Sequence, residues 1–347
     1  MSALYRLHRD ADLRRLNTFG VAARAPWLLQ VEDTAALPEA LALEQLRGLP
    51  LLPVGGGSNL LFAGDAPGVV LVIGSRRIEV LDNPAGQVRV RAEAGVPWHA
   101  LVMETVRLGL YGLENLALIP GSVGAAPIQN IGAYGMEAGE RILAVEAWDR
   151  EQEVAVRLDR QACAFGYRDS VFKQQPGRWI ITVVEFGLAR DGELRLGYAG
   201  LAEELQTMAV ATPGPREVAE AVIRIRQRKL PDPERLGNAG SFFKNPVVPA
   251  ALAATLRQAH PALPVFSAGN DQAKLSAAWL IDACGWKGVR EGDAGVSDAH
   301  ALVLVNHGNA SGMQLLDLAR RIAASVQQRF GVPLEPEPRL VGADWIG

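Results

Sequence analysis

Two glycine-rich loops are the parts of this sequence whose residue types most directly suggest chemistry. Pro53–Asn59 reads PVGGGSN and follows a predicted strand, and Ile119–Gly135 is long, poor in charge and rich in small residues. Glycine permits positive φ and lets backbone amides approach an anion, so such loops can cradle a phosphate or lie against a flat ligand. Neither loop matches GxGxxG before a helix or GxxxxGK followed by Ser or Thr, which disfavours Rossmann and P-loop sites. Taken alone, each loop is more often an ordinary turn.

The bulk composition excludes several classes of protein. The chain has 347 residues, which suits two or three domains, and a net charge of -3 with both signs interspersed. That distribution offers no field for nucleic acid or an anionic membrane, although a phosphorylated small molecule needs only a few local cations. The 2 cysteines and 5 histidines show no disulfide or metal-ligand spacing, so no metal is expected. The charged N-terminus lacks an apolar signal region, and no apolar run approaches the ~20 residues of a membrane span, so a cytoplasmic protein is expected.

The elements that must position these loops alternate between strand and helix signals, which predicts an α+β class. The predicted strands are Leu51–Val54, Val69–Ile73, Ile78–Leu81, Val88–Ala92, Ile142–Trp148, Val154–Leu158, Trp179–Leu188 and Leu302–Val305. The predicted helices are Thr34–Arg47 with Thr34 as N-cap, Pro97–Leu108, Pro215–Arg228, Pro249–Ala259, Ala273–Cys284 and a last helix from the Ser311 and Gln314 capping box to Gly331. The Pro/Gly-rich break at Pro231–Gly240 is the predicted domain boundary.

Five further segments, taken with the two loops, resemble those of the UDP-N-acetylenolpyruvoylglucosamine reductases, flavoenzymes of the vanillyl-alcohol-oxidase-like superfamily. The matching segments are Asn17–Gly20, Gly112–Asn115, Phe165–Ser170, Gly237–Pro246 and Leu334–Glu337. They keep the order of the family and extend over nearly the whole chain, so their combination is specific although no single one is.

The resemblance implies a PCMH-type FAD-binding fold of two α+β subdomains and a separate α+β substrate-binding domain. The implied division is 1–70 with 331–347, then 71–228, then 229–330, with the FAD-binding region at about 17–190. The C-terminal segment joins the first subdomain because Glu337 must return to the flavin.

The implied activity is NADPH-dependent, FAD-mediated reduction of UDP-N-acetylglucosamine enolpyruvate to UDP-N-acetylmuramate, a step of peptidoglycan precursor synthesis. FAD is expected to be non-covalent, NADPH and the sugar nucleotide to share one site in turn, and the protein to be a monomer. Two alternatives remain open. One is a flavin oxidase of the same superfamily acting on another sugar, and the other is a non-catalytic protein that binds FAD or a sugar nucleotide.

Three side chains suit the implied reaction. Hydride addition to an enol ether conjugated with a carboxylate builds negative charge, which calls for a cation at the carboxylate and a proton donor. Arg168 suits the first task because a guanidinium binds a carboxylate bidentately. Ser241 suits the second, with Glu337 as its acidic or polarising partner. Glu335 is the rival carboxylate, but the family pattern places the functional one at Glu337. Without the resemblance, Arg168 would be a surface ion-pair residue and Ser241 a turn residue.

The remaining implied site residues fall into two sets. Those expected at FAD are Asn17, Thr18, Gly55, Gly56, Gly57, Ser58, Asn59, Pro120, Gly121, Ser122, Gly124, Ala125, Gln129, Asn130, Gly132, Ala133, Tyr134, Gly135 and Arg339. Those expected at the substrate are Tyr198 on a closing loop, Lys229, Asn245, Lys274, Lys287 and His300. For the lysines, a solvated surface charge is the competing interpretation, and a lone histidine is more often structural.

The sequence departs from the family pattern at two places. Pro338 follows Glu337 where relatives carry a β-branched residue, and proline fixes φ and removes one N–H, so Glu337 could shift. The second glycine-rich loop, Ile119–Gly135, resembles the flavin-binding loop of the family and is called the flavin loop below. Ala125 and Ala126 replace small polar residues in it, so one or two hydroxyl contacts to FAD are expected to be missing.

Overall fold

The structure, a computed structural model, describes residues 4–82, 87–269 and 271–345 and divides into two compact units. Unit 1 comprises Met1–Ala11, Ala25–Gly56 and Pro67–Gln227, and unit 2 comprises Asp12–Arg24, Gly57–Ala66 and Arg228–Gly347. The three expected domains were defined by ligand-binding role, which a division by contacts does not test, so they remain a prediction. The mixture of helices and strands confirms the α+β class.

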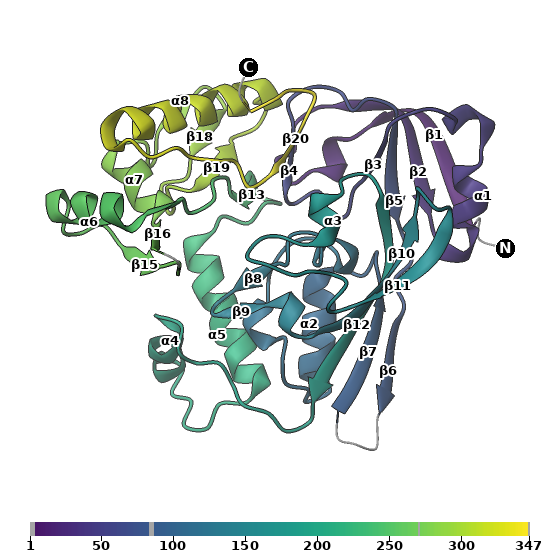
Figure 1. Cartoon of the computed structure of the whole chain (residues 1–347), viewed down its shortest axis with the longest axis horizontal. Helices are drawn as coiled ribbons and strands as arrows, with labels where there is room; N and C mark the ends of the chain where they lie inside the picture. Colours follow the sequence, from purple (N-terminus) through teal and green to yellow (C-terminus); the bar gives the residue numbers. More distant parts are fainter. Residues whose placement is uncertain (1–3, 83–86, 270, 346–347) are drawn as a thin grey trace. The chain divides into compact units, whose positions relative to one another are not determined.

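Unit 1 contains a four-stranded sheet in the order β1-β2-β5-β3 (Figure 1). Its strands are β1 (Tyr5–Asp12), β2 (Arg24–Val31), β5 (Val69–Ile73) and β3 (Leu51–Pro53). Strands β2, β5 and β3 are parallel, and their apolar side chains form a buried cluster around Leu29, Val31 and Leu71. Parallel strands are usually covered on both faces, which explains why Val69–Ile73 is apolar at every position.

A second, antiparallel sheet of unit 1 has the order β11-β10-β12-β7-β6. Its strands are β11 (Val154–Asp159), β10 (Ile142–Asp149), β12 (Trp179–Ala189), β7 (Gln87–Glu93) and β6 (Ile78–Asp82). Val88 and Val90 of β7 are buried, while Arg91 on the opposite face bonds to Glu146, so the predicted alternation is confirmed. Helix α2 (Trp98–Arg107) packs on the buried face, where the rings of Trp98 and Phe186 lie 5.9 Å apart.

The other elements of unit 1 are short except for one helix. They are α1 (Leu37–Leu41), β8 (Gly132–Ala133), β9 (Met136–Glu137), α3 (Val171–Gln174), α4 (Leu201–Thr207) and α5 (Pro215–Lys229), whose last two residues belong to unit 2. Helix α5 buries Val218, Val222 and Ile225 in the same core as α2, so the predicted apolar face is confirmed.

The described residues of unit 2 form three small sheets and three α-helices. Its strands are β4 (Leu60–Phe62), β13 (Gly237–Ser241), β14 (Val247–Pro249), β15 (Val265–Ser267), β16 (Gln272–Leu275), β17 (Arg290–Glu291), β18 (Ala294–Val296), β19 (Val303–Asn306) and β20 (Arg339–Val341). The helices are α6 (Ala250–Ala259), α7 (Ala277–Ala283) and α8 (Gly312–Phe330). The sheet orders are β13-β19-β18-β17, β14-β16-β15 and β20-β4. Ser311 and Gln314 form the predicted capping box of α8, and Gly331 ends it at φ 67°.

Two predicted helices are wrong in their extent. The segment predicted as one helix, Thr34–Arg47, is a short helix α1 between two 3-10 turns, and Asp33 rather than Thr34 accepts the capping bond from the Ala35 amide. A continuous helix that buried Leu37 and Ala40 would also turn Glu44 inward, whereas a break lets the chain bury Leu46 instead.

The second error concerns the start of α7. Residues 272–275 form strand β16, and the helix begins only after Ser276, whose hydroxyl accepts a bond from the Trp279 amide. Ser276 was an available N-cap signal. Strands β1 and β2 were not predicted, because the Tyr5–Asp12 segment is largely charged and its pairing is non-local.

Candidate active site

The two predicted glycine-rich loops meet inside unit 1. A Cβ atom on Gly56 would lie 2.8 Å from the Cα of Gly121, and one on Gly55 would lie 2.4 Å from the Ser122 Oγ. Any side chain at these glycines would therefore collide with the other loop. Among the described residues, the amides of Gly55, Gly56 and Gly121 donate no hydrogen bond within the protein. The crossing therefore has the close backbone approach and the available N–H groups that a dinucleotide pyrophosphate requires, so FAD fits this cradle.

Left-handed backbone is concentrated in the second loop and beside it. The non-glycine residues Leu118, Asn130, Tyr134 and Arg168 have φ of 58°, 45°, 50° and 53°. Such conformations are unfavourable for residues with a Cβ and persist where the surrounding contacts enforce them, typically at functional sites. This clustering of left-handed residues favours a functional role for the loop over the alternative that it is an ordinary turn.

Asn130 supports the loop through its own side chain. Its Nδ2 donates to the Gly166 carbonyl at 2.9 Å and to the Glu137 Oε2 at 2.7 Å, and its Oδ1 accepts from the Gly139 amide at 2.8 Å. These bonds join the flavin loop to the Phe165–Ser170 motif. The Asn130 side chain therefore stabilises the conformation of the loop through hydrogen bonds within the protein.

Arg168 lies against the end of the flavin loop. Its Nη2 donates to the Gly132 carbonyl at 2.7 Å and its Nη1 to the Asn130 carbonyl at 3.5 Å. A Cβ on Gly132 would lie 3.0 Å from the Arg168 Nη1, so glycine is needed for this approach. The Lys173 Nζ donates to the Arg168 carbonyl at 2.7 Å and supports its left-handed backbone. These contacts fix the guanidinium beside the loop.

Tyr198 lies on Tyr134 of the flavin loop. The two rings are 5.1 Å apart at 67°, and Tyr198 remains 46% exposed. The segment that carries it is anchored nearby, because the buried Asn115 donates to the carbonyls of both Tyr134 and Arg195. Arg195 donates in turn to the Gly135 carbonyl at 3.1 Å. Tyr198 is therefore presented next to the loop with its ring partly open to solvent, as a substrate-closing tyrosine requires.

If the Tyr198 hydroxyl contacts a phosphate of the sugar nucleotide, as we predict, Tyr198→Phe should raise the KM for the nucleotide about tenfold while turnover falls less. The hydrogen bond would be lost, but the ring contact with Tyr134 would remain. Steady-state kinetics with varied nucleotide would measure both constants. Tyr5→Phe is the matched control, since the Tyr5 hydroxyl bonds only to Glu39 at the surface. Unchanged constants for Tyr198→Phe would remove this tyrosine from the site.

In unit 2, the end of the first loop packs against the N-terminal motif. The Thr18 amide donates to the Gly57 carbonyl at 3.1 Å, and a Cβ on Gly57 would lie 2.7 Å from the Asn17 Cα. The Asn17 side chain is buried and bonds to the backbone of Leu13, Arg14 and Val21. Asn17 therefore shapes this turn, and Thr18 is the residue of the pair whose backbone meets the glycine loop.

Ser241 and Glu337 lie on adjacent segments of unit 2. Ser241 ends β13, and the Glu337 amide donates to the carbonyl of the next residue, Phe242, at 2.8 Å. The Glu337 carbonyl accepts from the Asn59 Nδ2 at 3.4 Å, and the Arg339 amide donates to the Asn59 carbonyl at 3.0 Å. A residue of the glycine loop thus holds the chain on both sides of Pro338.

Pro338 was expected to shift Glu337, but the backbone hydrogen bonds around Pro338 give no sign of such a shift. The Glu337 N–H and C=O are both bonded, and the N–H that proline lacks is not needed by either contact. Glu335, the rival carboxylate, is 70% exposed and pairs with the Lys244 Nζ at 2.9 Å. That geometry is a surface ion pair, so the adjacency of the chain to Ser241 favours Glu337 for the chemical role.

Three of the predicted substrate residues form a positive cluster in unit 2. Burial lowers the pKa of His300, and the neighbouring charges of Lys229 and Lys287 lower it further. The His300 Nδ1 accepts from the Leu302 amide at 3.2 Å, which also requires the uncharged ring. A neutral histidine between two lysines is an arrangement that suits an anionic ligand such as a diphosphate.

Asn245 and Lys274 are placed differently. The Asn245 Oδ1 accepts from the Ala277 amide at 3.0 Å at the start of α7, which leaves its N–H groups as the part that a phosphate would meet. Lys274 is central in the β14-β16-β15 sheet, opposite the exposed Val247 and Phe266. The substrate role of Lys274 stays a prediction.

The other residues predicted at FAD lie in the two glycine-rich loops, except for Arg339, which begins strand β20. They are Ser58, Pro120, Gly124, Ala125, Gln129, Ala133, Gly135 and Arg339. Ala125 lies close to the loop crossing, where a Cβ on Gly55 would be 3.2 Å from its Cβ, so a small residue suits this position. Their contacts to FAD stay predictions.

Two residues that contact the flavin loop were missed by sequence reasoning. The His99 Nδ1 accepts from the Leu118 amide at 3.0 Å, and the Arg226 Nε donates to the Leu118 carbonyl at 3.2 Å. Burial lowers the pKa of both side chains, and the Arg226 charge lowers the pKa of His99 further. For Arg226, the sequence signal was a basic residue next to the apolar face of the predicted Pro215–Arg228 helix. Basic residues are common at such positions, so this signal did not identify Arg226.

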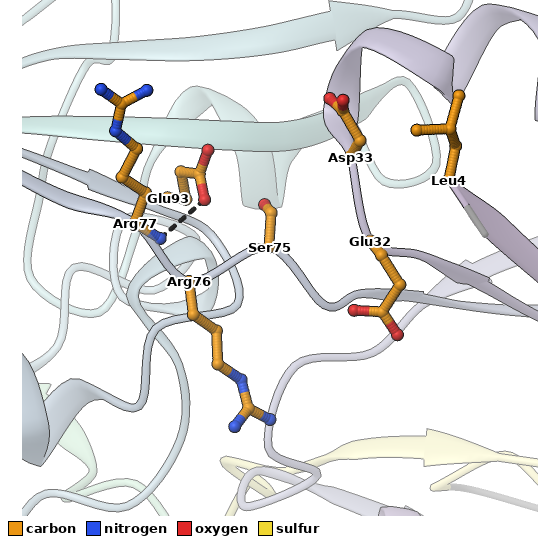
Figure 2. Close-up of a pocket in the computed structure, with 7 residues that line it drawn as sticks. All are labelled: Leu4, Glu32, Asp33, Ser75, Arg76, Arg77 and Glu93. Carbon is orange, nitrogen blue, oxygen red and sulfur yellow. Dashed lines mark hydrogen bonds between the residues drawn. The ribbon is translucent and has the colours of Figure 1, made fainter. Parts of the chain in front are cut away.

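A hollow elsewhere in unit 1 does not contain any predicted site residue (Figure 2). Its volume is about 460 Å³, and it is lined by Leu4, Glu32, Asp33, Ser75, Arg76, Arg77 and Glu93. Acidic and basic groups face it together, and the Glu93 Oε2 accepts from the Arg77 amide at 2.7 Å. In the described part of the chain, no group of three or more His, Cys, Asp or Glu residues is arranged to hold a metal ion. No helix there is both long and apolar enough to cross a bilayer.

Comparisons with known proteins show which family the chain resembles. The family model for the UDP-N-acetylenolpyruvoylglucosamine reductase C-terminal domain matches residues 232–341, and the FAD binding domain model matches residues 25–157. The reductase of Xanthomonas axonopodis pv. citri is 58% identical over 342 residues, covering 98% of both chains. The reductase of Xanthomonas campestris pv. campestris is 59% identical with the same coverage.

A solved structure extends the likeness to the fold. The reductase of Thermus caldophilus aligns with a TM-score of 0.66 at 28% identity, covering 97% of this chain and 99% of that one. The predicted FAD-binding fold and family are therefore confirmed, and the chain belongs to the UDP-N-acetylenolpyruvoylglucosamine reductases.

Proposed function

We propose that this protein reduces UDP-N-acetylglucosamine enolpyruvate to UDP-N-acetylmuramate with NADPH, through non-covalently bound FAD, in the cytoplasm and as a monomer. The observation that carries the proposal is the crossing of the two glycine-rich loops at Gly56 and Gly121. The Arg168 guanidinium is held at the end of the second loop, on the Gly132 carbonyl. Bound FAD would supply hydride transfer, and the residues that would hold it are the loop amides. The protein's own side chains then have to bind the nucleotide, steady the carboxylate and deliver a proton.

Each side chain has one task in this proposal. Lys229, Lys287 and the Asn245 amide bind the diphosphate, and Tyr198 closes over it. Arg168 binds the enolpyruvyl carboxylate, where negative charge increases as hydride reaches the terminal carbon. The Ser241 hydroxyl then gives its proton to the adjacent carbon and is reprotonated with the help of Glu337. The net change is addition of one hydride and one proton across the carbon–carbon double bond.

The surroundings of Cys163 and His99, the two side chains considered for covalent attachment, support non-covalent flavin binding. Cys163 is fully buried, and burial raises the pKa of its thiol to about 12, so it stays protonated and unreactive at neutral pH. The His99 Nδ1 is occupied by the Leu118 amide. We therefore expect the protein to purify yellow and to release all of its flavin on acid precipitation.

The test of the function is an anaerobic flavin titration. We expect NADPH to bleach the bound flavin, and UDP-N-acetylglucosamine enolpyruvate to restore the colour with formation of one UDP-N-acetylmuramate per flavin. An oxidase would instead consume oxygen with a sugar and without NADPH. A binding protein would keep its flavin but show no NADPH oxidation stimulated by the nucleotide. Either outcome, or flavin that stays in the acid pellet, would refute the proposal.

A further inference from the structure

The start of the flavin loop is held from both sides at one residue. Leu118 precedes the loop and has a left-handed backbone with φ 58°. Its N–H donates to the His99 Nδ1 at 3.0 Å, and its C=O accepts from the Arg226 Nε at 3.2 Å. Leucine rarely adopts this conformation, and the two bonds hold the Leu118 backbone in it where the chain enters the loop.

The end of the same loop reaches the same guanidinium. Tyr134 is also left-handed, with φ 50°, and its hydroxyl is hydrogen-bonded to Arg226. Its carbonyl accepts from the Asn115 Nδ2 at 3.0 Å, and its ring supports Tyr198 at a centroid distance of 5.1 Å. Arg226 thus contacts Leu118, just before the loop, and Tyr134, one residue before its end.

The surroundings of Arg226 are unusual for a cation. It lies on α5 immediately after Ile225, which is only 3% exposed, and burial lowers the pKa of its own guanidinium. The titratable groups that act on it within the described residues are His99 and Tyr134, and no carboxylate is among them. A desolvated arginine without an acid is costly unless its donors are used by polar acceptors, and the Leu118 carbonyl and the Tyr134 hydroxyl provide them.

We infer that Arg226 is a positioning residue that links the two ends of the flavin loop, at Leu118 and Tyr134. By holding both ends, Arg226 fixes the shape of the loop that binds FAD. It also fixes the Tyr134 ring on which Tyr198 packs. The inference rests on the proposed function for its substrate part. It does not require Arg226 to touch FAD or the nucleotide. Lysine would keep the charge but not the separated N–H donors that reach the carbonyl and the hydroxyl together.

The experiment compares Arg226→Met and Arg226→Lys with Arg224→Met. Arg224 is the matched control because it lies two residues earlier on α5, is 47% exposed and pairs only with Glu220. FAD affinity is measured on apoprotein by flavin fluorescence. We expect Arg226→Met to weaken FAD binding about tenfold or more and to raise the KM for the enolpyruvyl nucleotide, with turnover at saturating FAD and substrate changing less. The lysine variant should recover part of each loss, and Arg224→Met should match the wild type.

A milder variant keeps the inference testable if Arg226→Met does not fold. Tyr134→Phe removes only the hydroxyl and should reproduce part of both effects, and combining it with Arg226→Lys should be less than additive. Wild-type FAD affinity and KM in Tyr134→Phe and Arg226→Lys would overturn the inference. So would equal losses in Arg226→Met and Arg224→Met. If the wild type failed to reduce the nucleotide, the proposed function would be wrong, whereas the FAD affinities would still decide the role of Arg226.

Discussion

Ser241→Ala is expected to leave flavin reduction by NADPH almost unchanged and to slow reoxidation by the enolpyruvyl nucleotide by about 10²–10⁴-fold. Only the second half-reaction requires a proton at the carbon that becomes negative when hydride arrives, and the hydroxyl is the proposed donor. Ser241 ends strand β13, next to the backbone bond between Phe242 and Glu337 that places the two functional segments side by side. Anaerobic stopped-flow absorbance of the flavin measures the two half-reactions separately.

Companion variants make this test specific. Ser241→Cys should retain part of the rate, because a thiol can still donate a proton. Glu337→Gln should impair the same half-reaction, and the double variant should be less than additive because both residues serve one proton delivery. Glu335→Gln is the matched control, since Glu335 is 70% exposed and pairs with Lys244. If Ser241→Ala slowed the NADPH half-reaction and spared the other, Ser241 would be a contact of the shared pocket and not the proton donor.

Arg168→Lys is expected to retain FAD and nucleotide binding but to slow the nucleotide half-reaction by about 10²–10³-fold. Lysine keeps the charge and loses the planar fork that binds a carboxylate in two places. The structure gives a second reason, because the Arg168 Nη2 bond to the Gly132 carbonyl, 2.7 Å long, holds the group in place beside the flavin loop. A lysine ammonium would not be oriented by that contact in the same way.

The measurement is again stopped-flow reoxidation, with flavin content and nucleotide affinity determined alongside. Arg107→Lys is the control, because Arg107 is 68% exposed and pairs with Glu104 within helix α2. Near-normal reoxidation in Arg168→Lys would show that Arg168 has only a structural role, which is to hold the flavin loop. Loss of flavin from the variant would point to the same conclusion.

The prediction of the fold was most accurate where the periodicity was long and local. Val69–Ile73, the α5 segment and the capping box of α8 have the predicted type and nearly the predicted bounds. It failed where tertiary burial selects among local options, as at Thr34–Arg47, where burying Leu46 breaks the helix. Non-local pairing was also invisible, because nothing in the charged Tyr5–Asp12 segment indicates which strand will accept it as a partner.

The sequence by itself determined the family and the chemical types at the site, because the motifs occur in a fixed order and each matched residue can be read directly. It also predicted that glycine-rich loops, rather than a Rossmann turn, would form the cofactor site. Only the tertiary structure decided which glycines of the two loops meet. It also decided that the side chains of Asn17 and Asn130 form hydrogen bonds within the protein. The contacts that join Leu118 and Tyr134 through Arg226 likewise appear only in the folded chain. Residues 108 positions apart along the chain contact one another there. The physical reason is that left-handed backbone and a desolvated guanidinium are stable only when distant segments supply their hydrogen-bond partners, and no local pattern records where those partners will be.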